Sequence, residues 1–300
     1  MSSRLLSVFV LLCSMSACGG GGSGTPCTTD DQCPSHFCRA DGTCGPSGMP
    51  DAPMGSGDAG IDAPGPACVP NHDGVMVRSE VPLAAGAMAT FRIATSATWN
   101  TAGHANNDGS RTWDLSGQLA NDADTPVTLG SPAGAWWQAD FPGATYSAVL
   151  ASGSNLQGVF AIDANGVTLL GVVSPTGGAT KTELTYDPAA KILAFPFMAG
   201  STWMSTSTVT GYAQGVYGVY TEKYTSSVDQ VGTMTTPYGM FPVLRVATDL
   251  TRSSGGVPFL TKRTFAWTAE CFGTVATVSG QDNATGTEFS DDAEVRRLAP

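Results

Sequence analysis

Leu244-Arg245-Val246-Ala247-Thr248-Asp249-Leu250 is the stretch of sequence that decides the fold. Its apolar and charged residues alternate, so that Leu244, Val246 and Leu250 share one face of an extended chain. Arg245 and Asp249 share the other face, because successive side chains of a β-strand point to opposite sides. This period of two predicts a strand with one buried face and one polar face.

The same alternation recurs elsewhere in the chain. Leu184 and Tyr186 share a face in 181–186, as do Phe265 and Trp267 further along. No segment shows a convincing helical stripe of apolar residues. The pattern predicts strands at 87–94, 135–141, 145–151, 157–162, 166–173, 181–186, 191–197, 217–224, 244–250, 264–269 and 271–279.

Turn-forming residues separate these strands, as at Asn165-Gly166, Asp187-Pro188 and Ser254-Gly255-Gly256. Pro237-Tyr238-Gly239 predicts a further turn, which returns Phe241 to the core. Closely spaced strands with short turns predict a mainly β domain over 68–300, with an antiparallel curved sheet, a half-barrel or a sandwich. A domain of this length can bury a large core.

Three motifs in this domain follow one another in the order P-x-x-x-G-x-x-W, G-x-x-x-x-P-x-G-x-F and G-x-V. They begin at Pro196, Gly232 and Gly273. This order resembles that of uncharacterised envelope lipoproteins. The resemblance implies a curved antiparallel sheet, akin to that of periplasmic lipoprotein carriers, and implies nothing about activity.

The first 18 residues have the organisation of an export signal. A basic residue, Arg4, precedes the apolar run 5–12, and the small residues Ser16 and Ala17 stand before Cys18. The run is too short to span a bilayer. An ordinary signal peptide with an unmodified Cys18 is the alternative interpretation.

Ser16-Ala17-Cys18 resembles the lipobox of bacterial lipoproteins, although Met15 stands where leucine is usual. The resemblance implies that Cys18 is acylated and becomes the first residue of the mature chain. Residues 19–26 then form a flexible, glycine-rich tether. Gly19 is not a retention signal of the aspartate kind, so the resemblance implies an outer-membrane address, facing the periplasm or the cell surface.

The chain is acidic, with 14 basic and 25 acidic residues and a formal net charge of −11. Removal of the signal takes away Arg4 and leaves 13 basic against 25 acidic residues, or −12. This balance argues against nucleic acid as a partner and against electrostatic attraction to an anionic membrane. We expect attachment to the membrane to come from the lipid.

The eight cysteines divide into three groups. Cys13 leaves with the signal, and Cys18 is the lipidation site. The other six, an even number in an exported chain, are predicted to form disulfides. They are Cys27, Cys33, Cys38, Cys44, Cys68 and Cys271.

Residues 27–44 form a small cysteine-rich module with the spacing C-x5-C-x4-C-x5-C. It is too short to build an apolar core, so cross-links must hold it. Four cysteines allow three pairings, of which we favour Cys27–Cys38 with Cys33–Cys44. Zinc is the alternative, since His36 lies among the thiols, but the C-x2-C pairs of zinc sites are missing.

The same 18 residues read C-x-x-D-x-x-C and then C-x-x-D-G-x-C, which resembles the N-terminal cysteine-rich region of Dickkopf-type proteins. The resemblance implies a small extracellular disulfide module, and the signalling roles of the animal family are not carried over. Residues 45–67, rich in Gly, Pro and Asp, predict a disordered linker between this module and the β domain. Its aspartates predict solvated charge rather than a calcium site.

The four cysteines at 27–44 can pair with one another, so Cys68 and Cys271 are the two cysteines left to form a third disulfide. Cys68 opens the β domain, and Cys271 lies in a predicted late strand. First and last strands commonly lie side by side in closed sheets. The sequence therefore predicts a disulfide that joins the two ends of the domain.

Residues 69–80 were compared with the calcium loop D-x-[DN]-x-[DN]-G-x5-E. Asn71, Asp73, Gly74 and Glu80 match, but Val69 occupies the first position. The alternative, which we favour, is an Asp-Gly turn that leads into the first strand. We predict no metal and no cofactor.

No catalytic motif is present. The only histidines are His36, His72 and His104, and the sequence contains no nucleophile elbow, metalloprotease motif or phosphate loop. His104 lies in a polar loop that predicts a solvated turn. The six glutamates Glu80, Glu183, Glu222, Glu270, Glu288 and Glu294 offer no paired acid and base, so no catalytic residue is assigned.

Aromatic residues give a weaker indication of binding. Five of the seven tyrosines lie between Tyr212 and Tyr238. Trp136 and Trp137 are adjacent, so in a strand one of them would point outward or into a cavity. Stacking on a sugar or contact with a lipid would use such rings, although ordinary core packing explains them too.

These observations favour a surface-anchored lipoprotein with a non-enzymatic binding or structural role in the cell envelope. Its partner would be an apolar ligand, a polymer such as a polysaccharide, or an envelope protein. The alternative is a secreted-type glycan hydrolase or a glycan-binding adhesin, because glycoside hydrolysis needs only two carboxylates. A deep apolar cavity would favour the first hypothesis, and a groove with two convergent carboxylates would favour the second.

Overall fold

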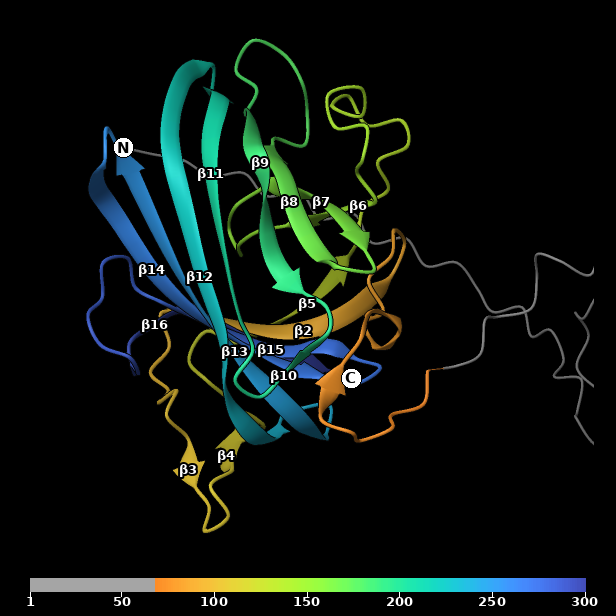
Figure 1. Ribbon diagram of the computed structural model, residues 1–300, viewed down its shortest axis with the longest axis vertical. Helices are drawn as coiled ribbons and strands as arrows, with labels where there is room; N and C mark the ends of the chain where they lie inside the picture. The colour runs from red at the N-terminus through yellow and green to blue at the C-terminus, as the bar shows by residue number, and fades with distance from the viewer. Residues whose placement is uncertain (1–67) are drawn as a thin grey trace, which may run out of the picture. The chain divides into compact units, whose positions relative to one another are not determined.

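The computed structural model describes residues 68–300, which form a curved, mostly antiparallel sheet (Figure 1). The prediction of a mainly β domain with a half-barrel sheet is confirmed. The signal, the tether, the cysteine module and the linker lie outside the described residues, as do the predicted sites at Cys18, Cys27, Cys33, Cys38 and Cys44.

The elements of the described residues are β-strands of 2 to 20 residues and one short 3-10 helix. They are β1 (Val75–Met76), η2 (Arg78–Glu80), β2 (Met88–Thr95), β3 (His104–Ala105), β4 (Arg111–Asp114), β5 (Ala123–Thr128), β6 (Tyr146–Val149), β7 (Gln157–Asp163), β8 (Gly166–Val173), β9 (Glu183–Ala194), β10 (Phe197–Met198), β11 (Thr202–Ala213), β12 (Val216–Thr235), β13 (Met240–Ser254), β14 (Val257–Ala269), β15 (Gly273–Gly280) and β16 (Asp292–Ala299). Within this part of the chain, no helix is long and apolar enough to cross a membrane.

The main sheet runs in the order β5-β2-β16-β15-β14-β13-β12-β11-β9-β8-β7-β6, and its two ends almost meet. A single bridge joins them: Gly130 donates to the Ser147 carbonyl at 2.7 Å and accepts from the Ser147 N–H at 2.9 Å. A Cβ at position 130 would lie 2.5 Å from the Ser147 hydroxyl oxygen, so glycine permits this approach. The sheet is therefore a nearly closed half-barrel.

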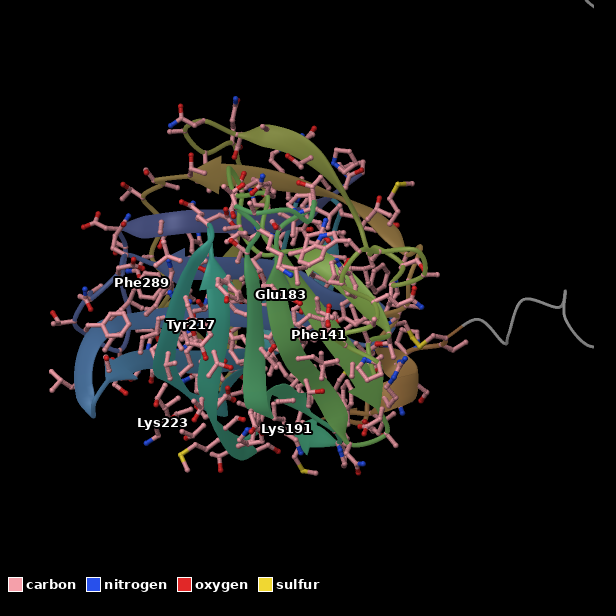
Figure 2. The ribbon with its side chains drawn as sticks, turned by 90° about the horizontal axis from the view of Figure 1, so that it is seen from above. Phe141, Glu183, Lys191, Tyr217, Lys223 and Phe289 are labelled. Atoms are coloured by element: carbon pink, nitrogen blue, oxygen red, sulfur yellow. A yellow bond between two sulfur atoms is a disulfide. The ribbon has the colours of Figure 1, made fainter. Side chains whose placement is uncertain are left out.

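Side chains fill the concave side of the sheet (Figure 2). One buried cluster brings Tyr146 of β6 and Val167 of β8 together with Leu244 and Val246 of β13. Because these strands are far apart in the strand order, the cluster lies inside the curve. Leu244 and Val246 are buried, as the alternation predicted, and Leu250, the third residue predicted on this face, is partly buried.

On the opposite face of β13, Asp249 is half-exposed, as expected for a polar face, but Arg245 is buried, and there the prediction is wrong. The Arg245 side chain is 1% exposed. Trp113 of β4 packs on Trp267 of β14 with 5.6 Å between ring centroids, and Phe265 shares this second cluster. The segment that contains β4 thus covers this face of the sheet. The predicted shared face of Phe265 and Trp267 is confirmed.

Residues 135–141 form consecutive turns and not the predicted strand. Their backbone N–H groups bond three residues back, as from Gln138 to the Ala135 carbonyl. Trp137 is buried with Phe141 against β7 and β8. The segment covers those strands, so an apolar run that resembles a strand is instead an irregular packing layer.

The predicted disulfide between Cys68 and Cys271 is confirmed, with 5.4 Å between the two Cα atoms. Cys271 does not lie in a strand as predicted, because β15 begins at Gly273. It lies in the turn that follows β14, with a φ of 67°. Its backbone N–H donates to the Glu80 carbonyl at 2.8 Å. The bond therefore fixes the start of the domain on a turn between two late strands.

Candidate functional site

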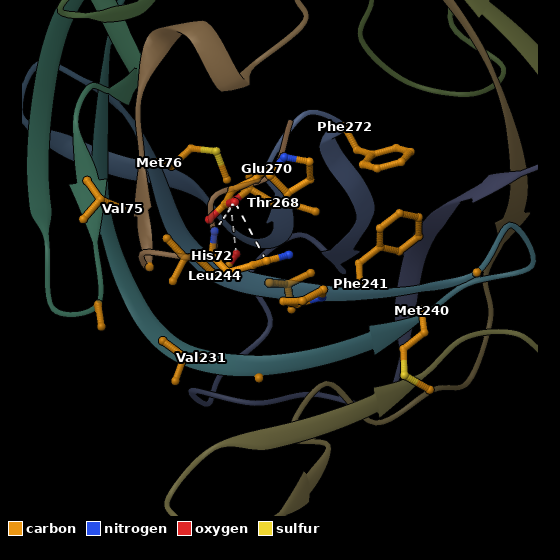
Figure 3. Close-up of a pocket in the computed structure, with 18 of the residues that line it drawn as sticks. His72, Val75, Met76, Val231, Met240, Phe241, Leu244, Thr268, Glu270 and Phe272 are labelled. Atoms are coloured by element: carbon orange, nitrogen blue, oxygen red, sulfur yellow. Dashed lines mark hydrogen bonds and ion pairs between the residues drawn. The ribbon is translucent and has the colours of Figure 1, made fainter. Parts of the chain in front are cut away.

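An apolar pocket of about 650 Å³ lies beside this disulfide. Most of its walls come from three parts of the chain, which are residues 70–76, the β12–β13 hairpin and the end of β14 with the turn after it (Figure 3). Ala199, which follows β10, completes the lining. We call it the apolar pocket and define it by its lining residues. These are Pro70, His72, Gly74, Val75, Met76, Ala199, Val231, Gly232, Tyr238, Gly239, Met240, Phe241, Pro242, Val243, Leu244, Thr268, Ala269, Glu270 and Phe272.

The β12–β13 turn supplies the aromatic wall. Thr236 donates to the Gly239 carbonyl at 2.8 Å, which closes the turn. Phe241 returns to the core with 5% exposure, as predicted. Its ring lies 4.8 Å from that of Phe272 and 6.2 Å from that of Tyr238. Tyr238 and Phe272 remain exposed at the edge of the pocket.

Glu270 is the acidic residue among those that line the apolar pocket, and none of them is Lys or Arg. Its side chain is 13% exposed. Oε2 accepts the backbone N–H of His72 at 2.8 Å and lies 4.0 Å from the His72 Nδ1. The Thr268 hydroxyl donates to the Leu244 carbonyl at 3.1 Å and is thereby satisfied.

The loop tested as a calcium site lies at this pocket but uses its carboxylates on its own backbone. Asp73 Oδ1 accepts the Val75 N–H at 2.7 Å, and Glu80 Oε2 accepts the Val77 N–H at 3.0 Å. The first of these bonds is that of an Asx turn entering β1. Within 68–300, no three His, Cys, Asp or Glu side chains are grouped to hold a metal ion.

The other predicted candidates do not converge on the pocket. His104 lies exposed in β3. Trp136 is half-buried, its indole N–H donates to the Ser174 carbonyl at 3.0 Å, and the Lys181 ammonium lies 5.0 Å from its ring centroid. Trp136 and Trp137 lie in turns and not in a strand, so the prediction that one of them points outward or into a cavity because strand residues alternate does not apply. Of the tyrosine group, Tyr238 lines the pocket.

Two further carboxylate clusters are occupied by internal partners. Glu222 is fully buried, and its carboxylate accepts bonds from the hydroxyls of Tyr186 and Tyr224 and from Arg252 Nε at 2.6 Å. Burial is the main cause that raises the pKa of both phenols, and the neighbouring charge of Glu222 adds to the shift. The tyrosines therefore remain neutral donors.

The second cluster is centred on the buried guanidinium of Arg245. Asp229 and Glu288 each bind it at 2.7 Å, and it lies 4.2 Å from the Phe265 ring centroid. Both carboxylates face one cation, which makes this a structural ion-pair network. In both clusters the carboxylates are bound to an arginine, whereas the acid and base of a glycosidase act on the substrate and on water.

Neither Glu270 nor Phe272 belongs to a motif that marks it as a site residue in the sequence. One feature of the sequence could have indicated the site. Glu270 is a charged residue in the mostly apolar stretch 267–272, and it stands beside Cys271, whose disulfide partner was predicted. Comparison of the chain with protein-family models, with curated proteins and with solved structures found no match.

Proposed function

We propose that this chain is a lipid-anchored protein of the cell envelope whose β domain binds an apolar ligand and catalyses no reaction. The apolar pocket carries the proposal. Its volume is that of small-molecule sites, and its walls are apolar apart from a few polar groups. A glycan hydrolase is less well supported, because the pocket presents one carboxylate where such enzymes use two.

The binding proposal predicts that a neutral apolar fluorophore, N-phenyl-1-naphthylamine, binds the full chain with an increase in emission. Val231→Trp should weaken this binding at least tenfold, because Val231 lines the pocket and an indole would fill part of its volume. Val149→Trp is the matched control. Val149 is also a half-exposed strand valine, 43% against 36%, but it does not line the pocket. Equal binding by both variants would refute the proposed site.

The anchoring proposal rests on Ser16-Ala17-Cys18 after the apolar run. We predict that cells expressing the chain incorporate labelled palmitate into it and that globomycin blocks its processing. Cys18→Ser should abolish the label completely. Cys13→Ser should retain it, since that residue lies within the signal. A labelled Cys18→Ser variant would show that the lipid is attached elsewhere.

The cysteine module at 27–44 and the linker at 45–67 complete the proposal. They would hold the β domain away from the membrane as a cross-linked spacer followed by a flexible one. The partner that such an arrangement serves is a lipid, a polysaccharide or another envelope protein. The apolar pocket favours the lipid.

A further inference from the structure

The apolar pocket is polar at one end and aromatic at the other. In Figure 3, Glu270 and His72 lie together on one side, and Phe241, Phe272 and Met240 lie across from them. A ligand that fills the pocket would therefore meet a carboxylate with one part and hydrocarbon or aromatic surface with another. This asymmetry is that of an amphiphile.

Glu270 has no Lys or Arg partner among the described residues. Its side chain is largely buried, yet its ion-pair distance to the His72 ring is 4.0 Å, beyond hydrogen-bond reach, and that ring is 65% exposed. Oε2 accepts one backbone N–H, and no bond to Oε1 occurs within residues 68–300. Carboxylates with this degree of burial are usually paired, because desolvation of an unpaired charge is costly.

Three carboxylates elsewhere in the domain show a contrast with Glu270, whereas buried Glu80 and Asp292, which do not line the pocket, also have no arginine partner within 68–300. Glu222, Asp229 and Glu288 each bind an arginine at 2.6–2.7 Å. Glu270 is therefore available to a cation supplied from outside. An ammonium group offers charge and N–H donors together, and such charge-assisted bonds are stronger than neutral ones.

We infer that the ligand of the apolar pocket is an alkylammonium amphiphile, a hydrocarbon chain that ends in a protonated amine held by Glu270. This inference rests on the proposed function and names its ligand class. The chain would lie along Met240, Phe241 and Phe272, where apolar area is removed from water. An alkyl carboxylate would place a second negative charge beside Glu270, so we expect it to bind more weakly than the ammonium.

Displacement of N-phenyl-1-naphthylamine from the full chain tests the inference with three probes of equal chain length. These are dodecylammonium, dodecanol and dodecanoate, at pH 7 and physiological ionic strength. We expect dodecylammonium to bind at least tenfold more tightly than dodecanol, and dodecanoate to bind most weakly. Glu270→Gln should remove the preference for dodecylammonium over dodecanol, so that the two probes bind within about twofold of each other. Glutamine keeps an oxygen that can accept the His72 N–H, so the turn is retained.

Asp124→Asn is the matched control for net charge. Asp124 is an exposed carboxylate outside the pocket, so its loss changes the charge of the chain equally but should leave the preference intact. Equal affinities for dodecylammonium and dodecanol in the unmodified chain would overturn the inference, as would a preference that persists in Glu270→Gln. Failure of all three probes and of the fluorophore to bind would instead overturn the proposed function.

Discussion

Removing the Cys68–Cys271 disulfide should lower the free energy of unfolding by about 5 kcal/mol in the chain-entropy model, because the bond closes a loop with a sequence separation of 203 residues. The double variant Cys68→Ser/Cys271→Ser is the clean test. A reducing agent would also act on any bridges among the four cysteines at 27–44. Urea titration followed by tryptophan fluorescence would report the shift in midpoint. A fall of less than about 1 kcal/mol would contradict the prediction.

The same variant should lose ligand affinity under conditions in which it remains folded. Pro70 and His72 follow Cys68, and Glu270 and Phe272 flank Cys271, so the bond ties two walls of the apolar pocket together. We expect N-phenyl-1-naphthylamine to bind at least tenfold more weakly, with the far-ultraviolet circular dichroism unchanged. Unchanged affinity would show that packing alone positions these walls.

The sequence predicted the parts of the fold that depend on local pattern. Alternation in 244–250 placed Leu244 and Val246 in the core, and turn residues placed the hairpin at Pro237-Tyr238-Gly239. The disulfide followed from counting cysteines in an exported chain. Each of these inferences needs only neighbouring residues or composition.

Arg245 shows where local pattern fails. Alternation assigned it to a polar face, and a charged face is normally exposed. Its burial depends on the distant segment around Trp113, and its charge is compensated by Asp229 and Glu288, 16 and 43 residues away. No window of sequence around β13 contains that information.

The strand predicted at 135–141 fails for a related reason. Its apolar residues do pack, with Trp137 buried, but against an existing sheet and not within one. The candidate site was even less accessible to sequence reasoning. Its walls come from 70–76, 231–244 and 268–272, with Ala199 between them in the chain, and the predicted disulfide alone connected the first of these ranges with the last.

Asp292 should make the stability of the domain depend on pH. Its side chain is fully buried at the start of β16, and neither carboxylate oxygen makes a well-formed hydrogen bond in the described part of the chain. Burial raises the pKa of Asp292 to about 7 from an ordinary value of 3.8; the nearby Trp99 backbone N–H opposes this shift, and the adjacent Asp291 charge adds to it. The folded state therefore holds this proton to a higher pH than the unfolded state does.

The direction of the effect follows from that difference. The stabilisation from Asp292 is complete below about pH 4 and is lost as the pH rises through about 7. A separation of about 3 pH units corresponds to on the order of 4 kcal/mol. Relative to the unmodified chain, Asp292→Asn should therefore gain stability progressively from pH 4 to pH 8, because asparagine carries no charge to bury.

Urea titrations of both proteins at pH 4, 6 and 8 would measure this gain, and taking their difference cancels the titration of the other carboxylates. Asp291→Asn is the matched control, since Asp291 is exposed and one residue away. Asp291→Asn should change the dependence of the free energy of unfolding on pH only slightly, because it removes one charge next to Asp292. If the difference between Asp292→Asn and the unmodified chain stays constant with pH, Asp292 is ionised in the folded state.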